Sequence, residues 1–198
     1  MWPRKPLLNL PVCDEITRPR GRWLRGCAPP VQLAEMFMVK VLTTHAARYP
    51  DLSRRPFELT VEREFRSPAA ALFRAWTQGL DGWLAAPGSV AMRPEVNAPF
   101  FFETEQWAEA ATEIQRHPHY GRFLQIIPDR LVQLTWMTGA NGTEGAETIV
   151  TVELHLRGEG SVLRLHHAGF PTASARDRHR ESWPLVLQQL AHRLGEPP

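Results

Sequence analysis

The sequence predicts an α+β domain in which a curved antiparallel sheet of about six or seven strands packs on one long C-terminal helix. Residues 147–157 alternate apolar and polar side chains, and after the turn Gly158-Glu159-Gly160 the alternation continues as far as His167. From Trp183 to Leu194 the apolar residues instead recur three and four positions apart. A change of period from two to about 3.6 indicates a half-buried hairpin followed by an amphipathic helix.

The predicted domain begins with a strand over residues 57–65, where apolar side chains alternate with Glu and Thr. This pattern is typical of a strand with one face in water. Ser67-Pro68 then predicts a helix N-cap and a first-turn proline. We therefore expect two short helices after the first strand, one over residues 69–78 and one around residues 80–85.

Three further strands are predicted before the hairpin, over residues 100–103, 120–127 and 131–138. The Ala and Glu residues of segment 104–118 favour a helix, whereas its position favours a long hairpin connection, and both interpretations are open. In the last helical segment Pro184 removes a backbone donor. We expect a short helix over residues 173–181, then a kink or a fresh start capped by Ser182.

Residues 1–56 are expected to form a basic, proline-rich extension, and residues 57–198 the domain. The extension holds ten Lys and Arg against four Asp and Glu, whereas the domain holds thirteen against seventeen. Apolar residues at helical spacing predict a short helix over residues 31–47. Alternatively, translation begins at Met36 or Met38, and the residues before that point do not belong to the natural protein.

Composition argues against several classes of function. The mild acidity of the domain argues against nucleic acid as a partner. Cys13 and Cys27 are the only cysteines, so residues 57–198 contain no disulfide and no thiol nucleophile. Reduced thiols, no apolar run of spanning length and no signal-peptide core predict a cytoplasmic protein without a membrane segment.

Few motifs carry chemistry, and we expect no catalytic residue, no metal and no cofactor. His117-Pro118-His119 offers two imidazoles but no third ligand at a diagnostic spacing. We therefore interpret it as a polar segment that leads into the following strand and not as a metal site. The loop 139–145 contains no Lys and precedes a strand, so it is a turn and not a phosphate site. No Gly-x-Ser-x-Gly motif is present. His167 is expected on the apolar face, where it is either a hydrogen-bonded structural group or a ligand contact.

Large aromatic residues come from separate predicted elements and are expected to converge beneath the terminal helix. One interpretation is a well-packed core; the other is a ligand cavity between sheet and helix, a common site for small molecules. The residues expected to line such a cavity are Trp83, Phe100, Phe102, Phe123, Trp136, His167, Trp183 and Leu187.

Four stretches, in this order and spacing, resemble the START-like (SRPBCC, helix-grip) superfamily over about residues 57–196. They are Arg63-Glu64-Phe65-Arg66-Ser67-Pro68 with Leu72-Phe73-Arg74-Ala75-Trp76-Thr77; Trp83 with Pro87; Tyr120-Gly121-Arg122-Phe123-Leu124 with Pro128-Asp129-Arg130-Leu131-Val132 and Thr135-Trp136; and His167-Ala168-Gly169-Phe170-Pro171 with Trp183. The branch most like this chain is related to the C-terminal domain of the activator of the heat-shock chaperone ATPase. Asn97-Ala98-Pro99 departs from the Gly-Gly pair that the family often has before a strand, and segment 107–115 is longer than the family pattern.

The resemblance implies a helix-grip fold with a hydrophobic cavity, but no single activity. We expect non-enzymatic binding of a small hydrophobic or aromatic ligand by a monomer or homodimer. One alternative is a module that binds a chaperone and activates its ATPase. Another is a cyclase or hydrolase that uses the cavity, with His167 as a proton shuttle.

Overall fold

One strand, two short helices, five further strands and a long helix follow each other along the chain in the computed structural model, which describes residues 46–107 and 114–196. The elements are β1 (Phe57–Phe65), α2 (Ala69–Thr77), the 3₁₀ helix η1 (Leu80–Gly82), β2 (Pro99–Trp107), β3 (Ile114–Ile127), β4 (Leu131–Thr138), β5 (Thr148–Arg157), β6 (Gly160–Phe170) and α3 (Ala173–Arg193). Within these described residues, no helix is both long and apolar enough to cross a membrane.

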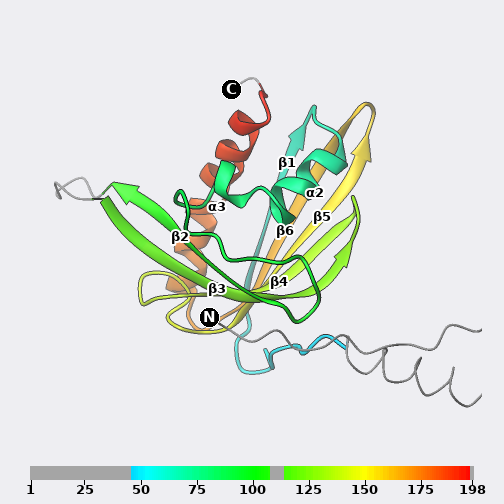
Figure 1. Ribbon diagram of the computed structural model, residues 1–198. Coiled ribbons are helices and arrows are strands. Elements are labelled where there is room, and N and C mark those ends of the chain that lie inside the picture. Colours follow the sequence, from blue (N-terminus) through cyan, green and yellow to red (C-terminus); the bar gives the residue numbers. More distant parts are fainter. Residues whose placement is uncertain (1–45, 108–113, 197–198) are drawn as a thin grey trace, which may run out of the picture. The chain divides into compact units, whose positions relative to one another are not determined.

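The strands form one six-stranded sheet in the order β1-β6-β5-β4-β3-β2, and every neighbouring pair is antiparallel. The sheet curves around α3 (Figure 1), and α2 contacts β4, β5 and β6. This arrangement confirms the predicted α+β helix-grip fold.

The core lies between the inner face of the sheet and one side of α3. The alternation predicted for the β5–β6 hairpin is confirmed, because Val150, Val152, Leu163 and Leu165 are all fully buried. On α3 the predicted apolar stripe is confirmed too, and its buried members are Trp183, Leu187, Leu190 and Ala191. Each large apolar side chain buried in this way stabilises the fold by about 1.5–3 kcal/mol.

The predicted fresh start of the terminal helix at Ser182 is wrong, because α3 continues through Pro184 as one helix. The helix begins after Thr172, whose hydroxyl oxygen accepts a hydrogen bond from the Ala175 N–H at 3.1 Å. Ser182 does not cap a new helix; its hydroxyl donates to the His179 carbonyl. Proline costs a helix one hydrogen bond, but buried side chains on both sides of Pro184 hold the two halves against the same core.

The predicted cap of α2 is also wrong. Pro68 occupies the N-cap position and provides no side-chain hydrogen bond. The Ser67 hydroxyl instead donates to the Glu196 carboxylate at 2.7 Å, and the backbone N–H groups of Arg66 and Ser67 donate to the same carboxylate. A partner 129 residues away therefore outcompetes the local cap. The second helix, η1, is shorter than the predicted range 80–85.

Segment 104–118 belongs to a hairpin, as one of the two interpretations expected. Strands β2 and β3 extend further than predicted and pair as far as Trp107 with Ile114. The helical interpretation is wrong for the described part of this segment, and residues 108–113 lie outside it. The predicted helix over 31–47 also lies outside the described residues, apart from residues 46 and 47, which are not helical.

Two positions explain how the chain bends around the inner strands. Asn97 has a φ of 64°, a left-handed conformation that Asn tolerates better than most residues. Its side chain donates to the Ala46 carbonyl and accepts from the Arg48 N–H, which holds the bend without the Gly-Gly pair. In β3 a Cβ on Gly121 would lie 2.1 Å from the Thr135 carbonyl oxygen, so only glycine permits this close approach.

Candidate functional site

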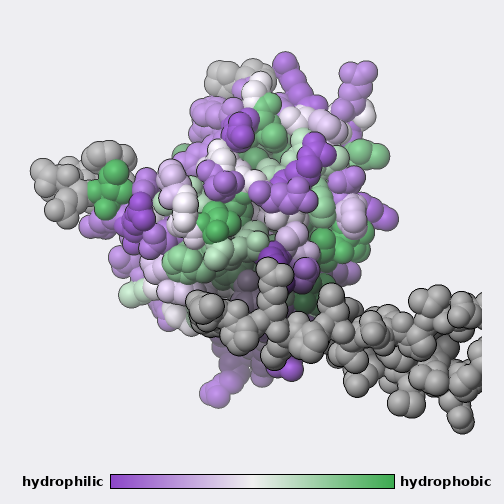
Figure 2. Space-filling model, in the orientation of Figure 1, coloured by the Kyte–Doolittle hydropathy of each residue, from purple (hydrophilic) through white to green (hydrophobic). Residues whose placement is uncertain are grey.

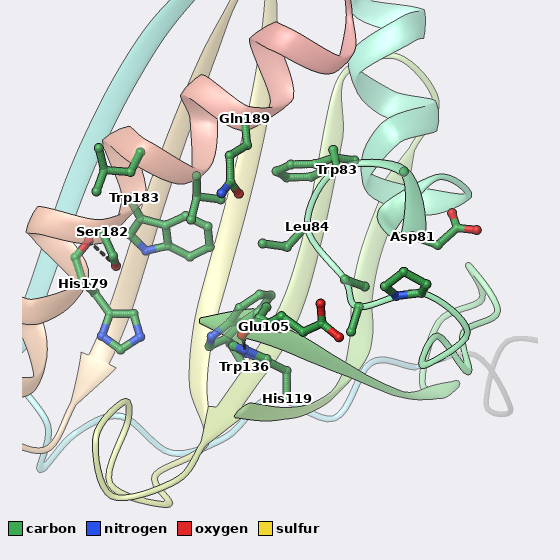
Figure 3. Close-up of a pocket in the computed structure, with 17 residues that line it drawn as sticks. Asp81, Trp83, Leu84, Glu105, His119, Trp136, His179, Ser182, Trp183 and Gln189 are labelled. Atoms are coloured by element: carbon green, nitrogen blue, oxygen red, sulfur yellow. Dashed lines mark hydrogen bonds between the residues drawn. The ribbon is translucent and has the colours of Figure 1, made fainter. Parts of the chain in front are cut away.

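A pocket of about 530 Å³ opens between one side of α3, the loop that contains η1, and the inner faces of β2, β3 and β4 (Figure 3). The lining residues come from all of these elements and mix aromatic, apolar and polar side chains. They are Asp81, Gly82, Trp83, Leu84, Ala85, Ala86, Pro87, Thr104, Glu105, His119, Trp136, His179, Ser182, Trp183, Leu185, Val186 and Gln189.

Three tryptophans from three separate segments meet at this pocket. Trp136 on β4 and Trp183 on α3 lie with ring centroids 5.5 Å apart. Trp83 follows η1, and its ring contacts Trp76 of α2 edge to face at 5.3 Å. The Trp83 indole N–H donates to the Ala75 carbonyl at 3.0 Å, which ties the loop to α2.

A buried chain of hydrogen bonds holds the wall on which Trp183 lies. The Trp183 N–H donates to His167 Nδ1 at 3.1 Å, so the ring proton of His167 is on Nε2 and is donated to the Thr148 hydroxyl oxygen at 2.7 Å. The Thr148 hydroxyl in turn donates to the Trp136 carbonyl at 2.5 Å. Burial lowers the pKa of His167 well below its ordinary value, with smaller contributions from His179 and His166. Both ring nitrogens are engaged and the ring is uncharged, so His167 is a structural group and is not available as a proton shuttle.

Two other histidines contribute imidazoles to the pocket. His119 stacks on Phe102, with ring centroids 4.7 Å apart, and its Nε2 lies 3.1 Å from the Thr104 hydroxyl. Burial, with smaller contributions from His117 and His179, lowers the pKa of His119 to about 3. His179 on α3 donates from Nδ1 to the Ala175 carbonyl at 2.9 Å. Burial also lowers the pKa of His179, so both rings are neutral at pH 7.

Among the described residues, the charged side chains that line the pocket are both carboxylates. Asp81 and Glu105 line it, and Glu105 pairs with Arg116 at 3.1 Å. Within the described residues, no Lys or Arg belongs to the lining, although the Arg193 guanidinium lies against Gly82 just outside it. A buried anion would therefore have no counter-charge at the inner end of the pocket. That end offers aromatic faces and uncharged hydrogen-bonding groups.

The eight residues expected around a ligand divide into two groups. Trp83, Trp136 and Trp183 line the pocket. The other five lie in the packed core and are absent from this lining: Phe100, Phe102, Phe123, His167 and Leu187. These five fill the space between sheet and helix, and the pocket lies beside them, at the edge formed by the η1 loop.

Sequence reasoning missed the two histidines of the lining. His119 is four residues before the buried Phe123 and lies on the same strand face. The predicted strand begins at residue 120, so this relation would be recognised only if the strand were predicted to begin earlier. His179 is four residues before Trp183 and shares its helix face, but the expected break near residue 182 obscured this relation. The described residues contain no group of three His, Cys, Asp or Glu side chains arranged to hold a metal ion.

Comparison with known proteins identifies the family. The family described as "Activator of Hsp90 ATPase homolog 1-like protein" matches residues 66–195. This chain belongs to that family. A search of curated proteins found no match.

Solved structures share the AHSA1-like fold over nearly their full length. The AHSA1 protein from Silicibacter pomeroyi is 25% identical, with a TM-score of 0.57, over 70% of this chain and 98% of its own. A protein from Chromobacterium violaceum is 24% identical, with a TM-score of 0.58, over 71% and 98%. An HSP90 activator from Plasmodium falciparum is 19% identical, with a TM-score of 0.55, over 71% and 97%.

Proposed function

We propose that this protein binds a small, largely apolar aromatic molecule in the pocket beside α3, without transforming it. The observation that carries the proposal is the convergence of three indoles from β4, α3 and the η1 loop on one pocket of about 530 Å³. Sites for small molecules are typically concave, rich in aromatic side chains and roughly 300–1,000 Å³ in volume. The proposed contacts are Trp83, Trp136 and Trp183, with His119 and His179 as polar contacts.

The other five residues expected around a ligand have a supporting role in this proposal. Phe102 stacks on His119, and His167 holds the indole of Trp183 by its hydrogen bond. Rings fixed in this way bind a ligand with little loss of side-chain freedom, which favours affinity. The proposal is for binding rather than turnover, because the histidine considered for proton transfer has both nitrogens engaged.

A panel of uncharged aromatic compounds tests this proposal by thermal shift and by quenching of tryptophan fluorescence. A ligand at 100 times its Kd stabilises the native state by about 2.7 kcal/mol, which raises the Tm by several degrees. Ser182→Trp places a large ring in the pocket from an exposed position on α3 and should abolish the shift. Gln188→Trp introduces the same ring at an exposed α3 position outside the lining and should preserve it. No response to any member of the panel would refute the proposal.

A second function, stimulation of a chaperone ATPase, is suggested by the family match and by the Plasmodium falciparum structure. It would use the outer surface of the sheet, where Tyr120 is 44% exposed and its ring lies 5.3 Å from that of Phe101. On the face shown in Figure 2, apolar and polar surface alternate and no broad apolar area dominates. Measuring Hsp90 ATPase rates with wild type and with Tyr120→Glu decides this point: equal rates with and without the wild-type protein would exclude it.

A further inference from the structure

The indole N–H groups of the three pocket tryptophans differ in one respect. Those of Trp83 and Trp183 are bonded within the protein, to the Ala75 carbonyl and to His167 Nδ1. That of Trp136 is buried and has no hydrogen-bond partner among the described residues. Trp136 itself is only 4% exposed.

A buried donor without a partner is costly, and structures rarely leave one unpaired. Trp136 lines the pocket between His119, at 4.9 Å between ring centroids, and Trp183, at 5.5 Å (Figure 3). An acceptor atom on a molecule bound beside this ring would satisfy the donor once the side chains that cover Nε1 move aside. An indole N–H can only donate, so a ligand group without a lone pair cannot take this place.

The surrounding charges limit the ligand further. His119 and His179 are neutral at pH 7, and a carboxylate ligand would lack a counter-charge at the inner end of the pocket. Among the described lining residues, a cation would meet opposite charge only at Asp81 and Glu105, and both side chains are exposed to solvent. A cationic group also could not accept a hydrogen bond from the Trp136 N–H. Burial of an unpaired charge is far more costly than burial of a neutral polar group.

We propose that the ligand is an uncharged aromatic molecule with a hydrogen-bond acceptor, such as a ketone oxygen, and that Trp136 Nε1 donates to that acceptor. This inference rests on the proposed function and adds the polarity of the ligand and the residue that selects it. Trp136 is thus a specificity-determining residue, whereas the faces of Trp83 and Trp183 contribute affinity without regard to the polar group.

Four probes of nearly the same shape separate the effect of the hydrogen-bond acceptor on affinity from the effect of ligand charge. They are 2-acetylnaphthalene, which carries the acceptor; 2-isopropenylnaphthalene, which lacks it; the anion 2-naphthoate; and the cation 2-naphthamidine. Isothermal titration of the full-length protein at pH 7 measures all four. The ketone should bind about two- to tenfold more tightly than the alkene. Each ion should bind at least about tenfold more weakly than the ketone.

Two matched variants test the role of Trp136. Trp136→Phe removes the indole N–H and keeps an aromatic ring, so the ketone and the alkene should then bind with equal affinity. Trp76→Phe removes another buried indole N–H that lacks a partner among the described residues, but Trp76 does not line the pocket. That control should keep the preference for the ketone. In the wild type, the Trp136 indole proton should also shift downfield in NMR spectra with the ketone and not with the alkene, a readout that does not depend on how the variants fold.

The outcomes separate this inference from the proposed function. Equal binding of the ketone and the alkene to the wild type, with no shift of the indole proton, refutes the role of Trp136 and leaves aromatic binding intact. If 2-naphthamidine binds more tightly than the ketone, the inference is wrong and the pocket is a cation site at Asp81 and Glu105. If 2-naphthoate binds more tightly than the ketone, the inference is wrong and the pocket is an anion site at Arg193. Failure of all four probes, with no response to the broader panel, overturns both proposals.

Discussion

Acidification should destabilise this protein between pH 6.5 and pH 5, and His119 should account for a measurable part of the loss. Burial lowers the pKa of His119 from 6.5 to about 3 in the folded protein. Between these two pH values the unfolded chain binds a proton that the native state does not. The contribution of neutral His119 to the free energy of unfolding is therefore fully present above pH 6.5 and is lost as the pH falls. At pH 5, 1.5 units below the unfolded pKa, one such histidine costs the native state about 2 kcal/mol. His167 acts in the same direction, because its pKa is lowered too.

The assay is urea unfolding of the wild type and of His119→Gln at pH 7 and pH 5. The Gln amide can still bond to the Thr104 hydroxyl but does not titrate. The free energy of unfolding of the variant should therefore drop by about 2 kcal/mol less than that of the wild type between the two pH values. An NMR titration of the His119 ring in the native wild type should show no protonation at pH 5. Equal drops in the two proteins, or a native ring that titrates near pH 6.5, would show that His119 is not desolvated as described.

Three further substitutions test the fold. Pro184→Ala restores an N–H in the middle of α3 and should raise the free energy of unfolding by up to about 3 kcal/mol; a decrease would mean that the proline shapes the helix. Leu190→Ala, at a fully buried site, should lower it by about 2–5 kcal/mol in urea titrations, and an unchanged value would contradict the docking of α3. Thr148→Val leaves the His167 N–H and the Trp136 carbonyl without their present partner and should cost about 1–3 kcal/mol for each; a cost below 0.5 kcal/mol would rule out the chain of bonds behind Trp183.

The strands could be predicted where alternation is complete and a turn closes each end. Strand β4 has the predicted bounds, 131–138, because the turn Pro128-Asp129-Arg130 precedes it and a glycine-rich loop follows it. The hairpin β5–β6 was predictable for the same reason. Strands β2 and β3 extend beyond the predicted ranges because Thr104, His117 and His119 occupy inner positions where the pattern requires apolar residues.

The errors share one physical cause, the dominance of tertiary contacts over local signals. Ser67-Pro68 has the local pattern of a cap, but the carboxylate of Glu196 takes the serine hydroxyl. Pro184 has the local pattern of a helix break, but burial of Trp183 and Leu187 keeps the helix intact. No local pattern carries such information about distant partners.

The candidate site was only partly readable for a related reason. The three pocket tryptophans were recognised because large aromatic residues in separate elements tend to converge. The sequence could not tell which aromatic rings fill the core and which border an opening, since this depends on how the η1 loop passes over the sheet. No sequence pattern indicates that the Trp136 indole N–H lacks a partner among the described residues, because this is found only by matching each donor with an acceptor in the structure.

Native mass spectrometry of freshly purified full-length protein is the most direct test of whether the pocket holds a ligand. We predict that the wild type and Gln188→Trp carry a co-purified small molecule, or gain one adduct on addition of 2-acetylnaphthalene. Ser182→Trp should show the mass of the protein alone under both conditions. Bare protein in all three samples, or an adduct that Ser182→Trp retains in full, would contradict binding in this pocket.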